Sequence, residues 1–271
     1  MISVLILTKN EEQDLPGCLE SVRWSDDVHV LDSYSTDSTE QIAAAIGVTF
    51  HQRMFDGYAS QRNAGLELPF KYPWIFVIDA DERPTASLIA EMNEVVQRAP
   101  EHIGAFRIRR RDFYMGRWLR HVQASPFYVR LLRVGRARYE REVNEIVRVE
   151  GDVVDLSSPF DHFPFSKGIQ HWFEKHNVYS SMEAAEVLRT RAGVVPFSAV
   201  KALIAKDFNE RRFHQKELFY RLPARPLVKF LILYIFKRGF LDGRPGYTYA
   251  RLQMIYEEMI VLKTRELLKG N

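Results

Sequence analysis

The first hundred residues alternate short apolar runs with segments of helical periodicity. The apolar runs predict strands at 2–7, 27–31, 48–51 and 74–78. Apolar side chains at the 3.6-residue period predict helices near 15–22, 38–46, 58–66 and 86–98. Gly47 is a stop signal for the second of these helices. Repeated strand–helix units form a parallel sheet with right-handed crossovers, so an α/β fold is expected.

The pattern changes after Pro100. Short alternating segments predict a smaller mixed or antiparallel extension of the sheet, at 105–110, 127–134, 138–149 and 152–156. From Ser166 onward the periodicity is helical, and one predicted stripe carries Ile169, Trp172, Phe173, His176, Tyr179 and Met182. Further helices are predicted at 197–213 and 249–268, with a tight loop at 239–246. The expected division is one sheet domain made of the halves 1–100 and 101–165, followed by a helical region at 166–271.

Composition narrows the class of protein only slightly. A chain of 271 residues suits one large domain, or one domain with an appendage. The net charge of +3 is too small to indicate nucleic-acid binding, and no signal peptide is expected at the start of the chain. The lone Cys18 cannot form an internal disulfide, which favours a reducing compartment.

The run at 74–78 ends in Asp79-Ala80-Asp81-Glu82. In open α/β sheets, ligands bind beyond the carboxyl ends of the strands. Two carboxylates at such a place predict a seat for a divalent cation and a diphosphate, because Mg²⁺ uses one or two carboxylates together with substrate phosphates. The alternative is that Asp81 or Glu82 only caps the helix that begins near Pro84.

The turns after the first two predicted strands differ from the common nucleotide folds. Residues 8–12 lack both G-x-G-x-x-G and a P-loop. The second strand ends at Asp32, whose carboxylate is placed to accept hydrogen bonds from a ribose or a base. Asp37 and Ser38 have the alternative role of capping the next helix.

Four blocks in order carry a family resemblance: residues 8–12 (TKNEE), 31–39 (LDSYSTDST), 61–66 (QRNAGL) and 78–82 (IDADE). Their sequence and spacing resemble the family 2 inverting glycosyltransferases of the GT-A fold. Within that family, the subgroup of bacterial lipopolysaccharide-core glucosyltransferases is the most similar. The resemblance covers about the first 85 residues and continues more weakly through 117–163 and into the helical tail.

The resemblance implies a role for each matching position. A nucleotide would be bound by Thr8, Asn10, Glu11, Asp32, Arg62 and Asp79. In this set, Asp32 would contact uracil or ribose, Asp79 would face the ribose, and Arg62 would help to hold the diphosphate. Asp81 would be the direct ligand of Mn²⁺ or Mg²⁺.

An inverting transfer also needs a base that takes the proton of the acceptor hydroxyl. The resemblance points to Glu145, although this chain has Asn144 where relatives often have His. Asp152 and Asp155 are rival candidates, and Glu145 could instead be one charge on an exposed edge strand.

Arg130 and His162 complete the candidate site. Arg130 would approach the diphosphate or an acidic acceptor, unless it belongs to the solvated face of alternating strands. His162 would complete the metal site, since imidazole is a competent ligand, unless it is a satisfied core histidine.

The longest apolar run, at 227–236, is flanked by Arg221, Arg225, Lys237 and Arg238. It is far shorter than the roughly 20 apolar residues of a spanning helix. An apolar helix between cations suits a membrane interface, and the alternative is a buried helix of the helical region. The expected place of action is the cytoplasmic face of the inner membrane, with peripheral attachment.

The function expected from these features is metal-dependent inverting transfer of a sugar from a nucleotide diphosphate donor, most simply a UDP-sugar. The acceptor would be a lipopolysaccharide-core sugar or another envelope glycolipid. A sugar nucleotidyltransferase remains an alternative, although such an enzyme would usually have the Gly-rich loop that is missing here. A non-catalytic nucleotide-binding or scaffold protein remains open as well.

Overall fold

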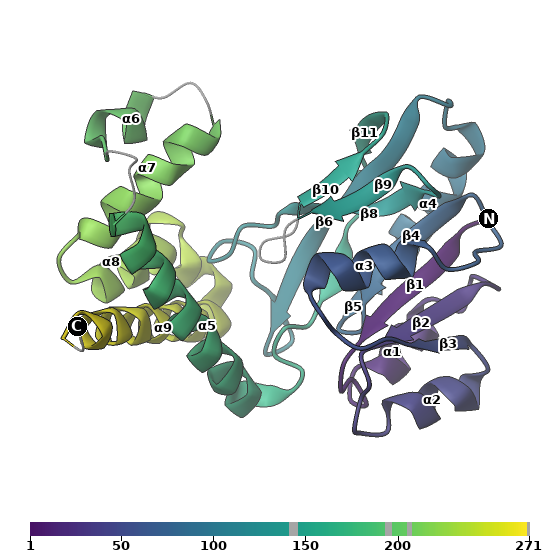
Figure 1. The fold of residues 1–271 in the computed structure, drawn as a ribbon, viewed down its shortest axis with the longest axis horizontal. Helices are drawn as coiled ribbons and strands as arrows, with labels where there is room; N and C mark the ends of the chain where they lie inside the picture. The colour runs from purple at the N-terminus through teal and green to yellow at the C-terminus, as the bar shows by residue number, and fades with distance from the viewer. Residues whose placement is uncertain (141–145, 193–196, 205–207, 270–271) are drawn as a thin grey trace. The chain divides into compact units, whose positions relative to one another are not determined.

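The chain forms two compact units in a computed structural model (Figure 1). The structure describes residues 1–140, 146–192, 197–204 and 208–269. The first unit, here called the sheet unit, comprises Met1–Trp118 and Ser125–Ser166. The second, here called the helical unit, comprises Leu119–Ala124 and Lys167–Asn271.

Strands and helices alternate in the first part of the sheet unit, as predicted. The elements are β1 (Ser3–Thr8), α1 (Leu15–Ser21), β2 (Val28–Asp32), α2 (Thr39–Ile46), β3 (Thr49–Gln52), α3 (Tyr58–Leu66), β4 (Trp74–Asp79) and α4 (Ala86–Arg98). Gly47 ends α2 in the left-handed conformation, with φ of 78°, which glycine adopts without steric cost. The hydrophobic pattern therefore located these elements to within one or two residues.

The second part of the sheet unit is built from strands. They are β5 (Glu82–Pro84), β6 (Ile103–Tyr114), β7 (Arg117–Trp118), β8 (Phe127–Arg133), β9 (Ala137–Glu140), β10 (Ile146–Val149), β11 (Asp152–Asp155) and β12 (Phe160–His162). Among the described residues the main sheet runs in the order β3-β2-β1-β4-β8-β6-β12-β5, and β9 pairs with β10 separately. Strands β1 to β4 are parallel, whereas β8 is antiparallel to both β4 and β6. The predicted mixed extension and the α/β fold class are confirmed.

Alternate residues of the central strands point into two apolar layers. Val4 and Ile6 of β1 pack on one face with side chains of α1, α2 and α4. Leu5, on the other face, packs with side chains of α3 and of the β9–β10 pair. Because both faces are covered, the parallel strands are apolar throughout, and their polar groups are confined to the strand ends.

The helical unit contains α5 (Gly168–Ala192), α6 (Ala199–Ile204), α7 (Phe208–Arg221), α8 (Arg225–Leu231) and α9 (Gly243–Lys269). A π-helical turn over Ile232–Phe236 and a 3-10 helix over Gly239–Asp242 connect α8 to α9. None of the helices in the described part of the chain has the length and apolar character needed to cross a membrane.

Three predictions for this unit differ from the structure. The helix predicted over 197–213 corresponds in the described residues to α6 and to α7, which extends eight residues further, to Arg221. The loop predicted over 239–246 is a 3-10 helix that leads directly into α9, and a Cβ on Gly246 would lie 2.1 Å from the backbone oxygen of Gly239. The stripe predicted on α5 is not a single buried face, because Trp172 is buried whereas Phe173 is exposed.

A short segment from the middle of the chain, Leu119–Ala124, belongs to the helical unit. Leu119 and Val122 are buried. The carboxylate of Asp242 accepts hydrogen bonds from the backbone N–H groups of His121 and Val122, at 2.9 and 2.8 Å. These bonds give the segment a fixed place among the helices.

Candidate functional site

Three neighbouring parallel strands end in polar residues at one edge of the sheet: β1 at Thr8, β2 at Asp32 and β4 at Asp79. The hydroxyl of Thr8 donates a hydrogen bond of 2.9 Å to the carboxylate of Asp32. Asp32 is fully buried, and it also accepts bonds from the backbone N–H and the hydroxyl of Ser35, at 2.7 and 2.5 Å. Through these bonds, the carboxylate of Asp32 stabilises the loop that follows β2.

The loops after β1 and β2 are bonded to each other. The Ser35 hydroxyl accepts from the Asn10 N–H at 2.7 Å, and the Asn10 side-chain oxygen accepts from the Thr36 N–H at 2.8 Å. The Glu11 N–H donates to the Thr39 hydroxyl at 2.9 Å. Asn10 has φ of 54°, a left-handed conformation that asparagine tolerates better than most residues. The structure thus brings Thr8, Asn10, Glu11 and Asp32 together in one pair of loops.

The capping role considered for Asp37 and Ser38 is only partly seen. Ser38 precedes α2 but makes no side-chain capping bond. Asp37 accepts from the backbone N–H and the hydroxyl of Thr39, at 3.1 and 2.6 Å, and from the N–H of Glu12 at 3.1 Å. Asp37 therefore fastens the start of α2 to the loop after β1.

Asp79 lies in a network of ion pairs. Arg62 of α3 contacts its carboxylate at 3.1 Å, and Arg130 of β8 contacts it at 2.9 Å. Arg130 also contacts Glu82 at 2.6 Å, and Glu82 accepts a bond of 2.9 Å from the backbone N–H of Asp79. The network joins α3, β4, β5 and β8, and it fixes the turn between Asp79 and Glu82.

The network sets the charge states of its members. Burial would raise the pKa of Asp79, but Arg62 and Arg130 hold it well below its ordinary value. Burial raises the pKa of Glu82 above its ordinary value, against the lowering effect of Arg130. The side chain of Arg130 is itself nearly buried, so its charge acts mainly on these two carboxylates.

The capping alternative for Asp81 and Glu82 is wrong. The N-cap of α4 is Thr85, whose side chain accepts a bond of 3.2 Å from the N–H of Leu88. Residues Glu82–Pro84 instead form β5, which pairs with β12 in antiparallel register. This pairing sets His162 opposite Glu82 and brings the end of β12 to the turn that contains Asp81.

Asp81, His162 and Asp112 form a second charged cluster. The Nε2 atom of His162 lies 3.2 Å from a carboxylate oxygen of Asp81, and its Nδ1 atom lies 2.5 Å from a carboxylate oxygen of Asp112. Asp112 is buried, while Asp81 retains 29% exposure of its side chain. Burial lowers the pKa of His162, but the bonds to Asp112 and Asp81 outweigh this effect and raise the pKa to about 9.

Asp112 was not among the residues selected from the sequence. It lies on β6, within an arginine-rich stretch, and the parallel pairing of β6 with β12 aligns it with His162. A pairing between strands 50 residues apart in the chain has no local signal. The one available clue was a carboxylate inside a strand otherwise occupied by Arg and apolar residues.

The residues present fit a divalent cation. Asp81 offers a carboxylate oxygen, and the Nδ1 contact with Asp112 leaves Nε2 of His162 directed toward Asp81. Histidines that bind metals commonly have a carboxylate on the other ring nitrogen. Within the described ranges, no group of three or more His, Cys, Asp and Glu residues has the arrangement of a metal site. A cation here would therefore need further oxygens, such as those of a diphosphate.

The proposed base, Glu145, lies outside the described residues. Its rivals are described and lie away from the cluster. Asp152 aligns with Ile103, nine residues before Asp112 on β6, which corresponds to roughly 30 Å along a strand. Asp155 is held by Arg107 at 2.6 Å. The register of β11 therefore disfavours both rivals.

Comparison with known proteins gives a consistent picture. A model described as glycosyl transferase family 2 matches residues 3–153. The chain is 28% identical over 268 residues to the lipopolysaccharide core biosynthesis glycosyltransferase LpsC of Rhizobium meliloti, covering 93% of this chain and 89% of that protein. It is 24% identical over 284 residues to the uncharacterized glycosyltransferase RT0209 of Rickettsia typhi, covering 98% of this chain and 87% of that protein.

Two solved structures are also similar. One is S. aureus TarS 1–349 in complex with UDP-GlcNAc, with 14% identity and a TM-score of 0.45, covering 100% of this chain and 92% of that chain. The other is glucosyl-3-phosphoglycerate synthase from Mycobacterium tuberculosis in complex with Mn²⁺, UDP and glucosyl-3-phosphoglycerate. Its identity is 23% and its TM-score 0.32, covering 43% of this chain and 44% of that chain.

Proposed function

Starting from the fact that the chain belongs to glycosyl transferase family 2, we propose that it is a metal-dependent inverting hexosyltransferase that uses a UDP-sugar. The family match supports transfer from a nucleotide-sugar donor, rather than a sugar nucleotidyltransferase or a non-catalytic scaffold protein. The proposed acceptor is a lipopolysaccharide-core sugar or another envelope glycolipid. LpsC, which is named for lipopolysaccharide core biosynthesis, aligns with nearly the whole chain and supports this choice.

The observation that carries the proposal is the cluster of Asp81, His162 and Asp112 at the sheet edge. Asp81 follows the end of β4, and β4 is the neighbour of β1 in the sheet. The end of β1 leads into the loop that contains Thr8, Asn10 and Glu11. A nucleotide bound by the loops after β1 and β2 would have its diphosphate beside β4, because ligands of such sheets lie across adjacent strand ends.

Asp81 and His162 would hold Mn²⁺ or Mg²⁺, and Asp112 would fix the ring of His162. When bound, the cation neutralises the charge that develops on the departing nucleoside diphosphate. The protein's own task at this point is to present one carboxylate oxygen and one imidazole nitrogen at fixed positions.

Glu145 is the proposed base. The acceptor hydroxyl oxygen attacks the anomeric carbon of the donor sugar, and its proton passes to the Glu145 carboxylate. The bond from the anomeric carbon to the diphosphate breaks on the opposite face, and its electron pair leaves with the nucleoside diphosphate. One displacement of this kind inverts the anomeric configuration.

The two arginines of the ion-pair network have different proposed tasks. Arg62 shares Asp79 with Arg130 but retains 13% side-chain exposure, which allows it to help hold a diphosphate. Arg130 is buried against both Asp79 and Glu82, so it is better placed to orient Asp79 toward the ribose than to contact the donor. Asp32 and Thr8 would shape the pocket for the base and ribose through their mutual bond.

The proposed place of action is the cytoplasmic face of the inner membrane, where the protein would be attached peripherally. A glycolipid acceptor is embedded in the bilayer, so its transferase must work at the surface. The exposed apolar residues of the helical unit, among them Ile235 and Phe236 next to Lys237 and Arg238, support such attachment.

The function can be tested by nucleotide release from a panel of UDP- and GDP-sugars, with Mn²⁺ or with EDTA. We expect slow donor hydrolysis with one UDP-sugar, and only with the metal. Glu145→Gln should lower transfer to an added acceptor by about 10²- to 10⁴-fold. Asp152→Asn, the matched control, should leave transfer unchanged. Equal turnover with Mn²⁺ and with EDTA would refute the proposed metal dependence. Near-normal transfer by Glu145→Gln would refute the assignment of Glu145 as the base.

A further inference from the structure

The π-helical turn and the 3-10 helix between α8 and α9 expose large aromatic side chains. Phe236 is 78% exposed and Phe240 is 48% exposed. The ring of Tyr234 lies against those of Phe240 and Tyr247, with ring centres 6.3 and 5.5 Å apart. These contacts tie the connection to the start of α9, so its aromatic side chains have a defined place. The accessible side chains of residues 229–251 are here called the connector face.

The connector face is rich in cations and poor in carboxylates. Its residues include a single acidic one, Asp242, against five basic ones: Lys229, Lys237, Arg238, Arg244 and Arg251. Asp242 is buried and bonded to His121, so it does not offset charge at the surface. Among the described residues, the ion pairs of this part of the chain are made by Arg221 and Arg225, and not by the five cations of the connector face. Their positive charges are therefore uncompensated.

The two outermost cations of the connector face lie over aromatic rings. The Nζ atom of Lys229 is 5.7 Å from the ring centre of Phe219, and the guanidinium of Arg251 is 5.7 Å from that of Tyr247. An aromatic ring attracts a cation but does not neutralise it. These contacts position positive charge beside apolar surface and leave it available to an external anion.

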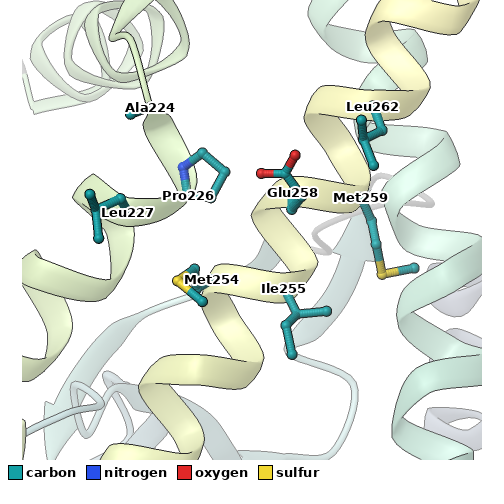
Figure 2. Close-up of a pocket in the computed structure, with 8 residues that line it drawn as sticks. All are labelled: Ala224, Pro226, Leu227, Met254, Ile255, Glu258, Met259 and Leu262. Carbon is teal, nitrogen blue, oxygen red and sulfur yellow. The ribbon is translucent and has the colours of Figure 1, made fainter.

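A second apolar surface of the helical unit has the opposite charge. Figure 2 shows a cavity of about 520 Å³ between α8 and α9, which Met254, Met259 and Leu262 help to line. The charged side chain on its wall is the carboxylate of Glu258. Leu262 is 53% exposed, so this surface resembles the connector face in apolar exposure and differs from it in charge. The two surfaces make a matched pair for experiment.

We propose that the connector face binds the surface of an anionic bilayer. Phe236 and Phe240 enter the boundary between head groups and acyl chains. Tyr234 and Tyr247 lie at the level of the head groups, where side chains with an apolar ring and a polar tip gather. The five cations contact lipid phosphates, which supply the negative charge that the helical unit itself does not offer.

This proposal gives the peripheral attachment proposed above a surface and a lipid charge. It rests on that attachment, whereas the transfer chemistry does not depend on it. Exposed aromatic side chains alone would fit many partners. Their combination with uncompensated cations matches the two layers of an anionic membrane surface, an apolar interior below a plane of phosphates.

The first test is flotation of the full-length protein with vesicles of phosphatidylcholine alone or with one quarter phosphatidylglycerol. We expect binding to the anionic vesicles, and its loss at high salt, because salt screens exposed charges. The double variant Arg238→Glu, Arg244→Glu should bind at least tenfold more weakly. The control variant Arg23→Glu, Arg189→Glu changes two exposed arginines and the net charge by the same amount, and it should bind as the wild type does.

The second test separates the aromatic contribution from the charge. Phe236→Ser should weaken binding to anionic vesicles about tenfold, whereas Leu262→Ser, on the wall of the cavity in Figure 2, should leave it unchanged. Donor hydrolysis is measured on the same samples, and Phe236→Ser should retain the wild-type rate. A wild-type protein that floats but hydrolyses no UDP-sugar would refute the proposed transfer and not the lipid surface.

Three results would overturn the proposal. One is equal flotation of the two double variants, and another is equal flotation of Phe236→Ser and Leu262→Ser. The third is a wild-type protein that binds neither kind of vesicle but sediments as a dimer that Phe236→Ser dissociates. That result would assign the connector face to a second copy of this chain.

Discussion

The sheet unit and the helical unit expose different kinds of surface. In the sheet unit the large apolar side chains lie between layers, and Phe76 and Phe160 are fully buried. In the helical unit, Phe236, Leu203 and Ile204 are 70–78% exposed. The sheet unit exposes some large apolar side chains as well, among them Met54 at 68% and Met115 at 53%, but the most exposed phenylalanine, leucine and isoleucine side chains named here belong to the helical unit. Exposed apolar surface of this kind is typical of contacts with partners or membranes.

The two units also use charge differently. In the sheet unit, charged side chains gather at one edge, where a closed network around Asp79 adjoins the partly open cluster of Asp81 and His162. In the helical unit, the buried pair of Arg225 and Glu257 joins two helices beside a cavity. The first arrangement is suited to chemistry on a phosphate-bearing ligand, and the second to holding a surface in shape.

The largest expected effect is on the open cluster of the sheet unit. Asp81→Ala removes the carboxylate assigned to the metal, and transfer should fall by about 10³-fold, the size of effect seen when one charge-stabilising group is lost. Nucleotide release measures the rate, and circular dichroism should show an unchanged fold. Asp155→Ala, at an exposed position of β11, serves as the control and should retain full activity. A rate within threefold of the wild type for Asp81→Ala would contradict the assignment.

The next effect concerns the closed network. Arg130→Met leaves the buried Glu82 without its cation, and it should lower the free energy of unfolding by about 3–5 kcal/mol. Urea denaturation followed by circular dichroism gives this value. Arg107→Met, which breaks a half-exposed pair with Asp155, should cost less than about 1 kcal/mol. Equal costs for the two variants would show that the network does not stabilise the sheet unit.

A smaller effect is expected at Asp112, which contacts His162 rather than a substrate. Asp112→Asn should weaken Mn²⁺ binding by about 10- to 100-fold, as loss of such orienting groups does. Titration of free Mn²⁺ by electron paramagnetic resonance, in the presence of UDP, measures the affinity independently of turnover. Asp161→Asn, a neighbour paired with Arg111, is the control. Unchanged affinity in Asp112→Asn would assign that carboxylate to strand pairing alone.

The smallest effect is expected on the exposed surface of the helical unit. Phe236→Ser changes a side chain that is 78% exposed, so the free energy of unfolding should stay within about 0.5 kcal/mol of the wild type. Thermal unfolding measures the change. A loss of 2 kcal/mol or more would mean that Phe236 is covered in the folded protein, and the contrast between the two units would then be weaker.

The sheet unit was largely predictable because each of its first elements has its own pattern. The apolar run before Asp79 and the stop signal at Gly47 need no distant partner to be recognised. The family expected from the four blocks is confirmed, and so is the expected α/β fold class. The alternative that Asp81 or Glu82 caps α4 was wrong because both residues closely precede the true cap, Thr85, and the pairing of β5 with β12 is not visible in the local sequence.

The helical unit was harder to predict because its apolar residues do not lie on one face. Ala202, Leu203 and Ile204 are consecutive apolar residues of α6, yet only Ala202 is buried. The hydrogen-bond partners of Asp112 and Asp242 could not be predicted from the local sequence, because each of these aspartates contacts a residue at least 50 positions away. Side-chain pairs of this kind depend on which strands and helices become neighbours in the fold. The pattern of residues within each strand or helix does not show which neighbours it will have.

The place of Leu119–Ala124 in the helical unit has a consequence for how the chain is made. Asp242 accepts a hydrogen bond from the backbone N–H of Val122, and it leaves the ribosome 120 residues after Val122. Domains usually fold as units in the order of their synthesis. Here the sheet unit is interrupted by six residues whose apolar side chains stay uncovered until the last helices have been synthesised. The segment can therefore take its native place only after Asp242 has been synthesised, and a chain that ends after Ser166 would carry Leu119 and Val122 without the helices that cover them.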